Sequence, residues 1–96
     1  MKDMIKNIID FRDERNWGSH DTPSNLAKSI IIEAAELLEN FQWSDDPEDL
    51  ENVKEELADI LIYSIAMVHD LGLDFEEIIY EKLKKNAIKY PVTKGE

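Results

Sequence analysis

The sequence contains no cysteine and little glycine or proline. Without thiols the chain can form neither a disulfide framework nor a thiolate zinc site, which fits an expected cytoplasmic location. Three glycines, three prolines and a hydrophobic fraction of 43% argue against disorder. No segment approaches the roughly 18 consecutive apolar residues of a membrane span, and no signal-peptide apolar region follows Met1. We therefore expect one domain over residues 1–96, with a modest core and no membrane partner.

Positive charge is also scarce. Eleven Lys and Arg residues stand against 22 Asp and Glu residues, which gives a formal net charge of −11. A nucleic-acid polymer is an improbable partner, because binding its backbone needs a basic face. A small anionic ligand stays possible, since divalent cations can bridge carboxylates and phosphates.

The spacing of apolar residues predicts an all-α protein with four main helices. Amphipathic periodicity of about 3.6 residues recurs along the chain, and no strand pattern, repeat or long linker interrupts it. The predicted helices cover residues 2–15, 23–40, 47–71 and 75–89, and the tail 92–96 is expected to be loose.

Local signals predict where these helices begin and end. Thr22-Pro23 and Asp46-Pro47 read as helix starts, because a capping side chain precedes proline at the first helical position. Asp74, with Glu77 three residues later, resembles a capping box. Gly72 is expected to end the third helix.

The second half of the third helix is apolar on nearly every side, from Ile60 to Val68. A helix of this kind is normally buried all round. The chain has too few other helices to cover it, so we expect a homo-dimer or tetramer with this helix at the interface. The predicted fold is a four-helix bundle that is completed by homo-oligomerisation.

Two carboxylate pairs lie within otherwise apolar helical runs. Glu33 and Glu36 are three residues apart, as are Glu56 and Asp59, so each pair shares a helix face. Four oxygen ligands with no His or Cys favour a hard cation, Mg²⁺ or Mn²⁺. On spacing alone, ordinary solvated acids explain these residues equally well.

Beyond these acids the chain resembles the MazG-like nucleotide pyrophosphohydrolases. This family belongs to the superfamily of all-α nucleoside triphosphate pyrophosphohydrolases, and the resemblance lies close to its dCTP pyrophosphatase branch. The matching residues follow the family's order and cover most of the chain. They are Phe11, Glu14-Arg15-Asn16-Trp17, Pro23-Ser24-Asn25-Leu26-Ala27, Glu33-Ala34-Ala35-Glu36-Leu37, Phe41-Gln42-Trp43, Glu56-Leu57-Ala58-Asp59-Ile60-Leu61-Ile62-Tyr63, Lys82, Asn86 and Lys89-Tyr90-Pro91.

The resemblance implies a Mg²⁺-dependent reaction that cleaves a nucleoside triphosphate to the monophosphate and pyrophosphate. It makes Glu33, Glu36, Glu56 and Asp59 the metal ligands. Glu33 and Glu36 are also the candidate catalytic residues. The general base stays unassigned, because some relatives have two adjacent glutamates where this chain has Ile32-Glu33.

The resemblance also implies the substrate-binding residues. Trp17 and Trp43 match base-pocket aromatics, while a core role for each remains open. Phosphate contacts are expected from lysines, and a surface role remains open for Lys28 and Lys89. Tyr63 could reach a phosphate or simply pack. The full substrate-binding set is Trp17, Asn25, Lys28, Trp43, Tyr63, Lys82, Asn86, Lys89 and Tyr90.

Two departures from the family pattern bear on the preferred base. Many relatives read Phe-His-Thr-Pro where this chain has His20-Asp21-Thr22-Pro23, and dCTP-specific members carry a histidine near the position of Ile8. The expected substrate is a pyrimidine deoxynucleotide such as dCTP, or a noncanonical nucleotide in a house-cleaning role. One alternative class is a non-catalytic acidic helical module that binds a basic partner. Another is a di-iron bundle, but the Glu-x-x-His motifs of that fold do not occur in this sequence.

Overall fold

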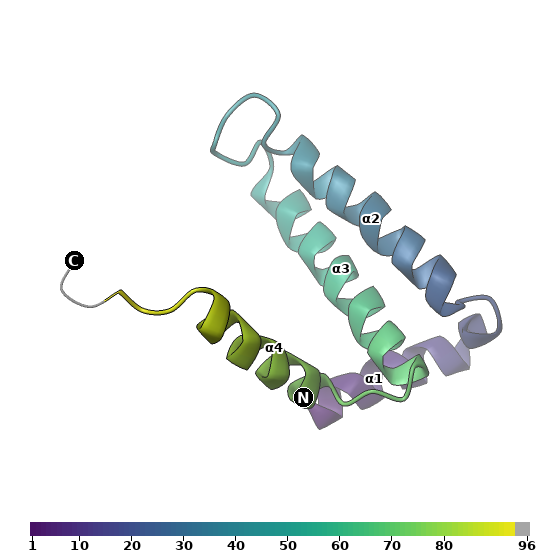
Figure 1. The fold of residues 1–96 in the computed structure, drawn as a ribbon. Helices are drawn as coiled ribbons and strands as arrows, with labels where there is room; N and C mark the ends of the chain where they lie inside the picture. Colours follow the sequence, from purple (N-terminus) through teal and green to yellow (C-terminus); the bar gives the residue numbers. More distant parts are fainter. Residues whose placement is uncertain (94–96) are drawn as a thin grey trace.

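The fold is an antiparallel pair of long helices with two further helices joined to one end (Figure 1). The structure is a computed structural model and describes residues 1–93. Along the chain it contains α1 (Lys2–Glu14), a short 3-10 helix η1 (Trp17–Ser19), α2 (Pro23–Glu39), α3 (Leu50–Asp70) and α4 (Phe75–Lys89). The all-α prediction is confirmed for residues 1–93, which contain no strand.

The packing of α2 against α3 forms the centre of the molecule. The antiparallel arrangement brings the first turns of α2 beside the second half of α3 (Figure 1). Leu26 on α2 and Ile65 and Ala66 on α3 are the buried apolar residues of the described chain. This core lies at the end of the pair where α1 and α4 join it.

Capping side chains start two helices where the sequence predicts. Thr22 Oγ1 accepts a hydrogen bond from Asn25 N at 3.1 Å, directly before Pro23. Asp74 Oδ1 accepts one from Glu77 N at 2.9 Å. Each cap satisfies an N–H group that the first turn leaves unpaired.

The predicted start of the third helix at Pro47 was wrong, since α3 begins at Leu50. Asn40 holds the residues directly before α3 in a non-helical conformation. Its backbone oxygen accepts a hydrogen bond from Glu48 N at 2.9 Å, and its side-chain oxygen accepts one from Asp49 N at 3.1 Å. Asp49 becomes the N-cap instead, and its carboxylate accepts hydrogen bonds from two backbone N–H groups.

A glycine ends α3 as predicted. Gly72 has φ +70°, a left-handed conformation that costs glycine little. Gly72 N donates to His69 O, and Leu73 N donates to Val68 O, each at 3.0 Å. These two hydrogen bonds form a Schellman motif, which turns the chain sharply into α4.

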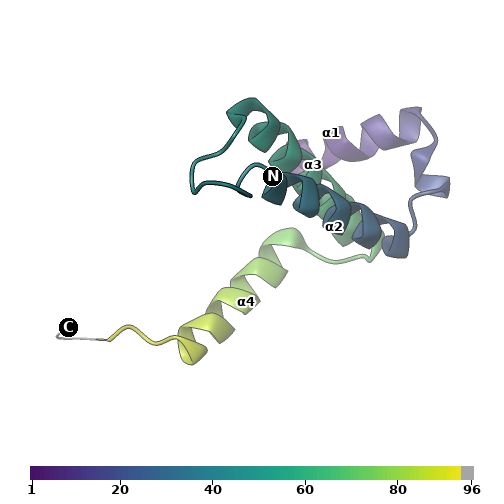
Figure 2. The same cartoon turned by 90° about the horizontal axis from the view of Figure 1, so that it is seen from above.

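The helix α4 does not join a four-helix bundle within this chain. It points away from the α2–α3 pair in two perpendicular views (Figures 1 and 2) and contains no buried residue. The four predicted helices are confirmed. A single chain does not form the bundle by itself, so its completion by homo-oligomerisation stays a prediction. The predicted loose tail falls partly on residues 94–96, outside the described residues; residues 92–93 have no regular secondary structure.

The chain exposes more surface than a compact monomer of its size. Its Cα radius of gyration is 16.6 Å, whereas a compact domain of this length has about 12.5 Å. Its accessible surface is 7789 Å², against about 5,700 Å² expected from its mass. None of its described helices is both long and apolar enough to cross a membrane.

Candidate active site

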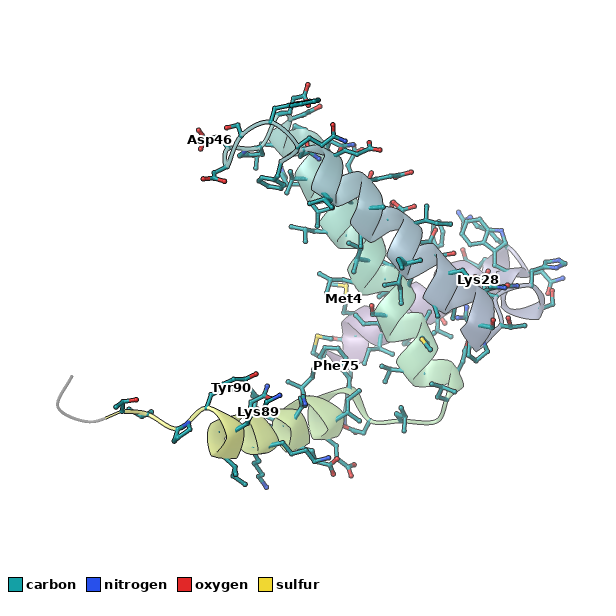
Figure 3. The ribbon with its side chains drawn as sticks, turned by 45° about the horizontal axis from the view of Figure 1, so that its top comes forward. Met4, Lys28, Asp46, Phe75, Lys89 and Tyr90 are labelled. Carbon is teal, nitrogen blue, oxygen red and sulfur yellow. The ribbon has the colours of Figure 1, made fainter. Side chains whose placement is uncertain are left out.

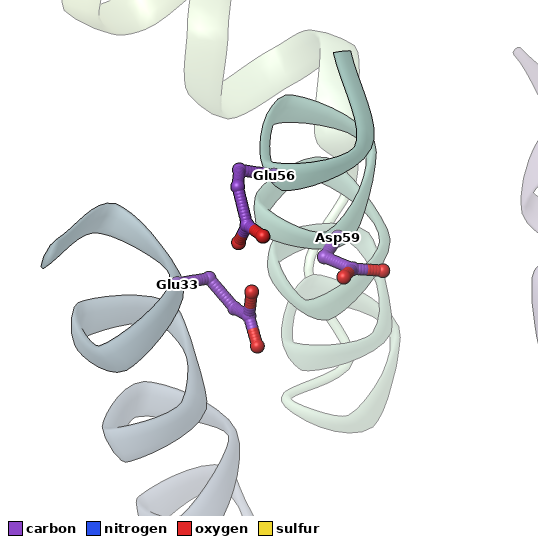
Figure 4. Close-up of side chains that lie close together, drawn as sticks. All are labelled: Glu33, Glu56 and Asp59. Carbon is purple, nitrogen blue, oxygen red and sulfur yellow. The ribbon is translucent and has the colours of Figure 1, made fainter. Parts of the chain in front are cut away.

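Three carboxylates meet between α2 and α3. Glu33 on α2 lies opposite Glu56 and Asp59, which are one turn apart on α3 (Figure 4). One oxygen from each residue lies within 4.8 Å of the other two. We call Glu33, Glu56 and Asp59 the carboxylate cluster.

Glu56 occupies the most enclosed place in this cluster, with a relative exposure of 7%. Its Oε2 atom is buried and has no hydrogen-bond partner among residues 1–93. Contact with Glu33, then burial, raises the pKa of Glu56; Asp59 adds to this, while contact with Glu36 acts the other way. An orphaned carboxylate oxygen beside two further acids fits a hard divalent cation, which would satisfy the oxygen and offset the repulsion.

Glu36 lies at the edge of this arrangement. It is exposed, and it is outside the set of oxygens that lie within 4.8 Å of one another. Its contact with Glu56 nevertheless shows that its side chain turns toward α3. Three of the four predicted metal ligands therefore come together, with the fourth beside them.

A cavity of about 440 Å³ adjoins the carboxylate cluster. Its walls come from α1, from η1 and the following loop, from the start of α2 and from the second half of α3. Asp59 belongs to both the cavity wall and the cluster. The lining residues are Asn7, Ile8, Phe11, Arg12, Trp17, Asp21, Leu26, Asp59, Ile62, Tyr63 and Ala66.

Two aromatic rings form one wall of the cavity. The Phe11 and Trp17 ring centroids are 5.6 Å apart with an interplanar angle of 70°, an edge-to-face contact. The Arg15 guanidinium lies 3.5 Å from the Phe11 centroid and covers that ring. A left-handed residue, Asn16 with φ 55°, turns the chain from α1 into η1 and so places Trp17 beside Phe11. The wall can accept a flat apolar ring.

Hydrogen bonds fix the loop that follows Trp17. Asp21 N donates to Trp17 O at 2.9 Å, and Asn25 Nδ2 donates to His20 O at 3.1 Å. Asn25, a predicted substrate-binding residue, thus supports the loop and does not line the cavity. Asp21 also lines the cavity, although it was not among the predicted site residues.

An ion pair fastens α1 across α3 beside the cavity. Arg12 donates to Asp70 twice, from Nη1 at 3.0 Å and from Nη2 at 2.7 Å. The hydrogen bond with Asp70 raises the pKa of Arg12, and this effect outweighs burial, which lowers it. The negative charges of Asp70, Asp21 and Asp13 raise the pKa further by smaller amounts. Arg12 occupies the next place on the apolar stripe of the first helix, and that was the signal in the sequence for a buried, paired arginine.

Tyr63 lines the cavity one turn after Asp59. Burial raises the pKa of Tyr63, and the charges of Asp59, Glu33 and Asp21 add to that rise. The phenol therefore keeps its proton and can donate a hydrogen bond. This predicted substrate-binding residue therefore lies in the cavity wall, next to the member of the carboxylate cluster that also lines the cavity.

Several predicted residues lie away from the cluster and the cavity. Trp43 is 88% exposed in the connection between α2 and α3, at the end of the pair opposite α1 (Figure 1). Figure 3 shows Lys89 and Tyr90 at the far end of α4, with Lys28 exposed on the early part of α2. Within one chain these candidates are not assembled, nor are Lys82 and Asn86 on the outlying helix α4.

The chain belongs to the MazG-like family, whose profile matches residues 28–96. It is similar to dCTP pyrophosphatase 1 of Mus musculus, with 31% identity over 96% of this chain. The Homo sapiens and Bos taurus proteins of that name are 30% and 32% identical to it. The chain spans about three fifths of the length of these relatives, 59% of the mouse protein.

A solved structure shares the fold. The crystal structure of a pyrophosphatase from Archaeoglobus fulgidus superposes with a TM-score of 0.87 and 38% sequence identity, over 96% of this chain and 93% of that one. Membership of the family and the helical architecture thus agree with the resemblance drawn from the sequence.

Proposed function

We propose that this chain is a Mg²⁺-dependent nucleoside triphosphate pyrophosphohydrolase that releases a nucleoside monophosphate and pyrophosphate. A pyrimidine deoxynucleotide such as dCTP is the first candidate substrate, followed by noncanonical nucleotides. The observation that carries the proposal is the place of Asp59, which belongs to both the carboxylate cluster and the aromatic-lined cavity. A nucleotide has the matching two ends, an anionic triphosphate and a flat base. The relatives named dCTP pyrophosphatase support the same reaction.

The cluster residues would hold the cation through hard oxygen ligands, with Glu33, Glu56 and Asp59 closest together and Glu36 beside them. Bound Mg²⁺ would neutralise phosphate charge and lower the pKa of a water molecule; Mn²⁺ fits the same ligands. In the reaction a water oxygen bonds to the α-phosphorus, the bond from that phosphorus to the α–β bridging oxygen breaks, and pyrophosphate leaves. A carboxylate oxygen of Glu33 or Glu36 that the cation leaves free accepts the proton of the water.

The cavity residues would bind and orient the nucleoside. Phe11 and Trp17 offer the base an apolar wall, and the protonated Tyr63 hydroxyl would donate a hydrogen bond to the nucleotide from the cavity wall. Lysines are expected to offset phosphate charge that the cation does not neutralise. Within the single chain, Lys82 and Lys89 cannot do this for their own cluster, because α4 points away (Figure 2).

A homo-dimer or tetramer is part of the proposal. The exposed area exceeds that of a compact monomer by about 2,000 Å², roughly twice the minimum for a specific interface. Large apolar side chains on α2 and α3, among them Ile31, Leu38, Leu57 and Leu61, are exposed. A second copy that covered such side chains could also bring Trp43 or the α4 lysines to the first copy's site. The expected cytoplasmic location stays a prediction.

The decisive experiment measures pyrophosphate release from a panel of standard and modified nucleoside triphosphates, with Mg²⁺ and with a chelator. We expect release that needs Mg²⁺ and that Glu36→Gln and Asp59→Asn each abolish. Glu55→Gln is the matched control, since Glu55 is an exposed acid on α3 outside the cluster. A wild-type chain that releases nothing from any nucleotide, with variants more stable than the parent, would favour the acidic binding module instead.

A further inference from the structure

The cavity wall carries one ionisable group without an assigned task. Of the charged residues that line the cavity, Arg12 is held by Asp70 and Asp59 belongs to the carboxylate cluster. Asp21 is half-buried, and across residues 1–93 its carboxylate makes no hydrogen bond or ion pair. The nearest guanidinium is therefore already neutralised, and Asp21 keeps its acceptor oxygens for a ligand.

The backbone around Asp21 is fixed before any ligand arrives. Asp21 N donates to Trp17 O at 2.9 Å, and Thr22, the next residue, is the N-cap of α2. Asn25 Nδ2 holds the carbonyl oxygen of His20 on the other side. A side chain presented from such a loop is preorganised, which is what selective recognition needs.

We propose that Asp21 determines base specificity by accepting a hydrogen bond from an exocyclic amino group of the nucleobase. This inference rests on the proposed function, because it assumes that the base enters the cavity beside Phe11 and Trp17. An ionised carboxylate only accepts hydrogen bonds, so it complements the amino group of cytosine and opposes the carbonyl oxygen that uracil and thymine carry at the same position. The favoured substrates are therefore amino-bearing bases, with cytosine first among pyrimidines.

The same charge orients the nucleotide. A carboxylate in the cavity repels phosphate oxygens, whereas a cation in the carboxylate cluster attracts them. The two ends of the substrate are thus directed to different ends of one site. Asp21 acts on the base, and the cluster acts on the triphosphate.

The test compares dCTP with dUTP, which differ at position 4 of the base. The wild-type chain should prefer dCTP by about 10- to 100-fold in kcat/KM, the range for one well-placed hydrogen-bonded pair. Asp21→Asn should bring this ratio to within about threefold, mainly through the KM of dCTP, because an amide can donate to a carbonyl or accept from an amine. Asp21→Ala should also remove the preference.

Asp13→Asn is the matched control. Asp13, like Asp21, acts electrostatically on Arg12, but it does not line the cavity. This variant should keep the wild-type ratio, which separates base reading from a general change of charge near Arg12. Thermal unfolding of each variant shows that the loop and α2 still form.

Either of two kinetic results would overturn the inference: a wild-type preference for dUTP, or an unchanged dCTP/dUTP ratio in folded Asp21→Asn. Calorimetric binding of dCMP and dUMP supplies a second measurement that does not depend on hydrolysis. Absence of hydrolysis from every nucleotide contradicts the proposed function, whereas equal binding of the two monophosphates by the wild-type chain contradicts the role of Asp21.

Discussion

The carboxylates of Glu33 and Glu56 meet across the α2–α3 interface, although like charges at this distance repel (Figure 4). The pKa of Glu56 is raised by contact with Glu33 and by burial. The ionised form of Glu56 therefore destabilises the metal-free fold, in the place where a cation would offset its charge.

Replacing Glu56 with glutamine should stabilise the metal-free protein. A raised carboxyl pKa means that the folded chain binds this proton more tightly than the unfolded chain does. The stability linked to Glu56 is thus fully present below its ordinary pKa of 4.5 and is lost as the pH rises through the raised pKa of the folded chain. Thermal unfolding with chelator should show a larger gain for Glu56→Gln at pH 8 than at pH 5.

The same variant should lose most of the stabilisation that Mg²⁺ gives. Mg²⁺ should raise the unfolding temperature of the wild-type protein, since a ligand that binds only the folded state stabilises it. Glu55→Gln should keep this shift. A Glu56→Gln protein with the full wild-type response to Mg²⁺ would contradict a role for Glu56 as a ligand.

Asp59→Asn should impair both ends of the substrate site. Because Asp59 belongs to the carboxylate cluster and also lines the cavity, we expect kcat/KM to fall by at least about 100-fold through weaker charge stabilisation. Steady-state pyrophosphate release checks this, again beside Glu55→Gln. A decrease of less than tenfold would place the cation elsewhere.

Trp17→Ala should weaken the binding of every nucleotide, whichever base it carries. Stacking on an aromatic side chain is worth about 1–3 kcal/mol per base, so KM should rise by roughly 10-fold or more. Trp17→Phe, which keeps a flat ring, should retain most of the affinity. If Trp17→Ala leaves KM unchanged, the Phe11–Trp17 wall is only a packing contact.

Arg12→Met should destabilise the fold by roughly 1–3 kcal/mol, less than the cost of breaking a fully buried ion pair, because the contact is only partly buried and the Asp70 side chain keeps 19% of its exposure. The variant leaves Asp70 without the guanidinium that it contacts at 2.7 Å. Adding Asp70→Leu should restore much of the lost stability, because an apolar pair can replace a buried ion pair. Chemical denaturation of the three proteins measures this coupling. Lys6→Met should change stability little, since its pair with Asp10 is exposed.

Leu61→Glu should prevent self-association. Leu61 is a large exposed side chain on α3, on the same face as Leu57, and a buried charge there would oppose an interface. Sedimentation should show a dimer or tetramer for the wild-type chain and a smaller, less stable species for the variant. A monomeric wild-type chain would contradict the proposed assembly.

The helices and three of the four acids could be predicted because their signals are local. Thr22, Gly72 and Asp74 each act on residues a few positions away, and the structure confirms all three. The start of α3 was wrong because the competing contact is less local: Asn40 holds Glu48 and Asp49 from across the connection.

The cavity was harder to predict, since its walls come from four separate segments. Trp17 and Tyr63 were in the predicted site, but Phe11, Arg12 and Asp21 were not. Arg12 and Asp70 are 58 positions apart, and no spacing rule connects them. The helix α4 was predicted with its correct bounds. Its position away from the α2–α3 pair could not be predicted, because its periodicity shows that it has an apolar face, not which molecule covers that face.

The double membership of Asp59 has a thermodynamic consequence. A group shared by two binding places couples them, and equilibrium coupling is reciprocal. If the base and phosphates tighten the hold on the cation by some factor, the cation must tighten the hold on the nucleotide by the same factor. Titrations of the metal with and without nucleotide, and of the nucleotide with and without metal, must therefore close a single cycle, whose coupling free energy Asp59→Asn should reduce.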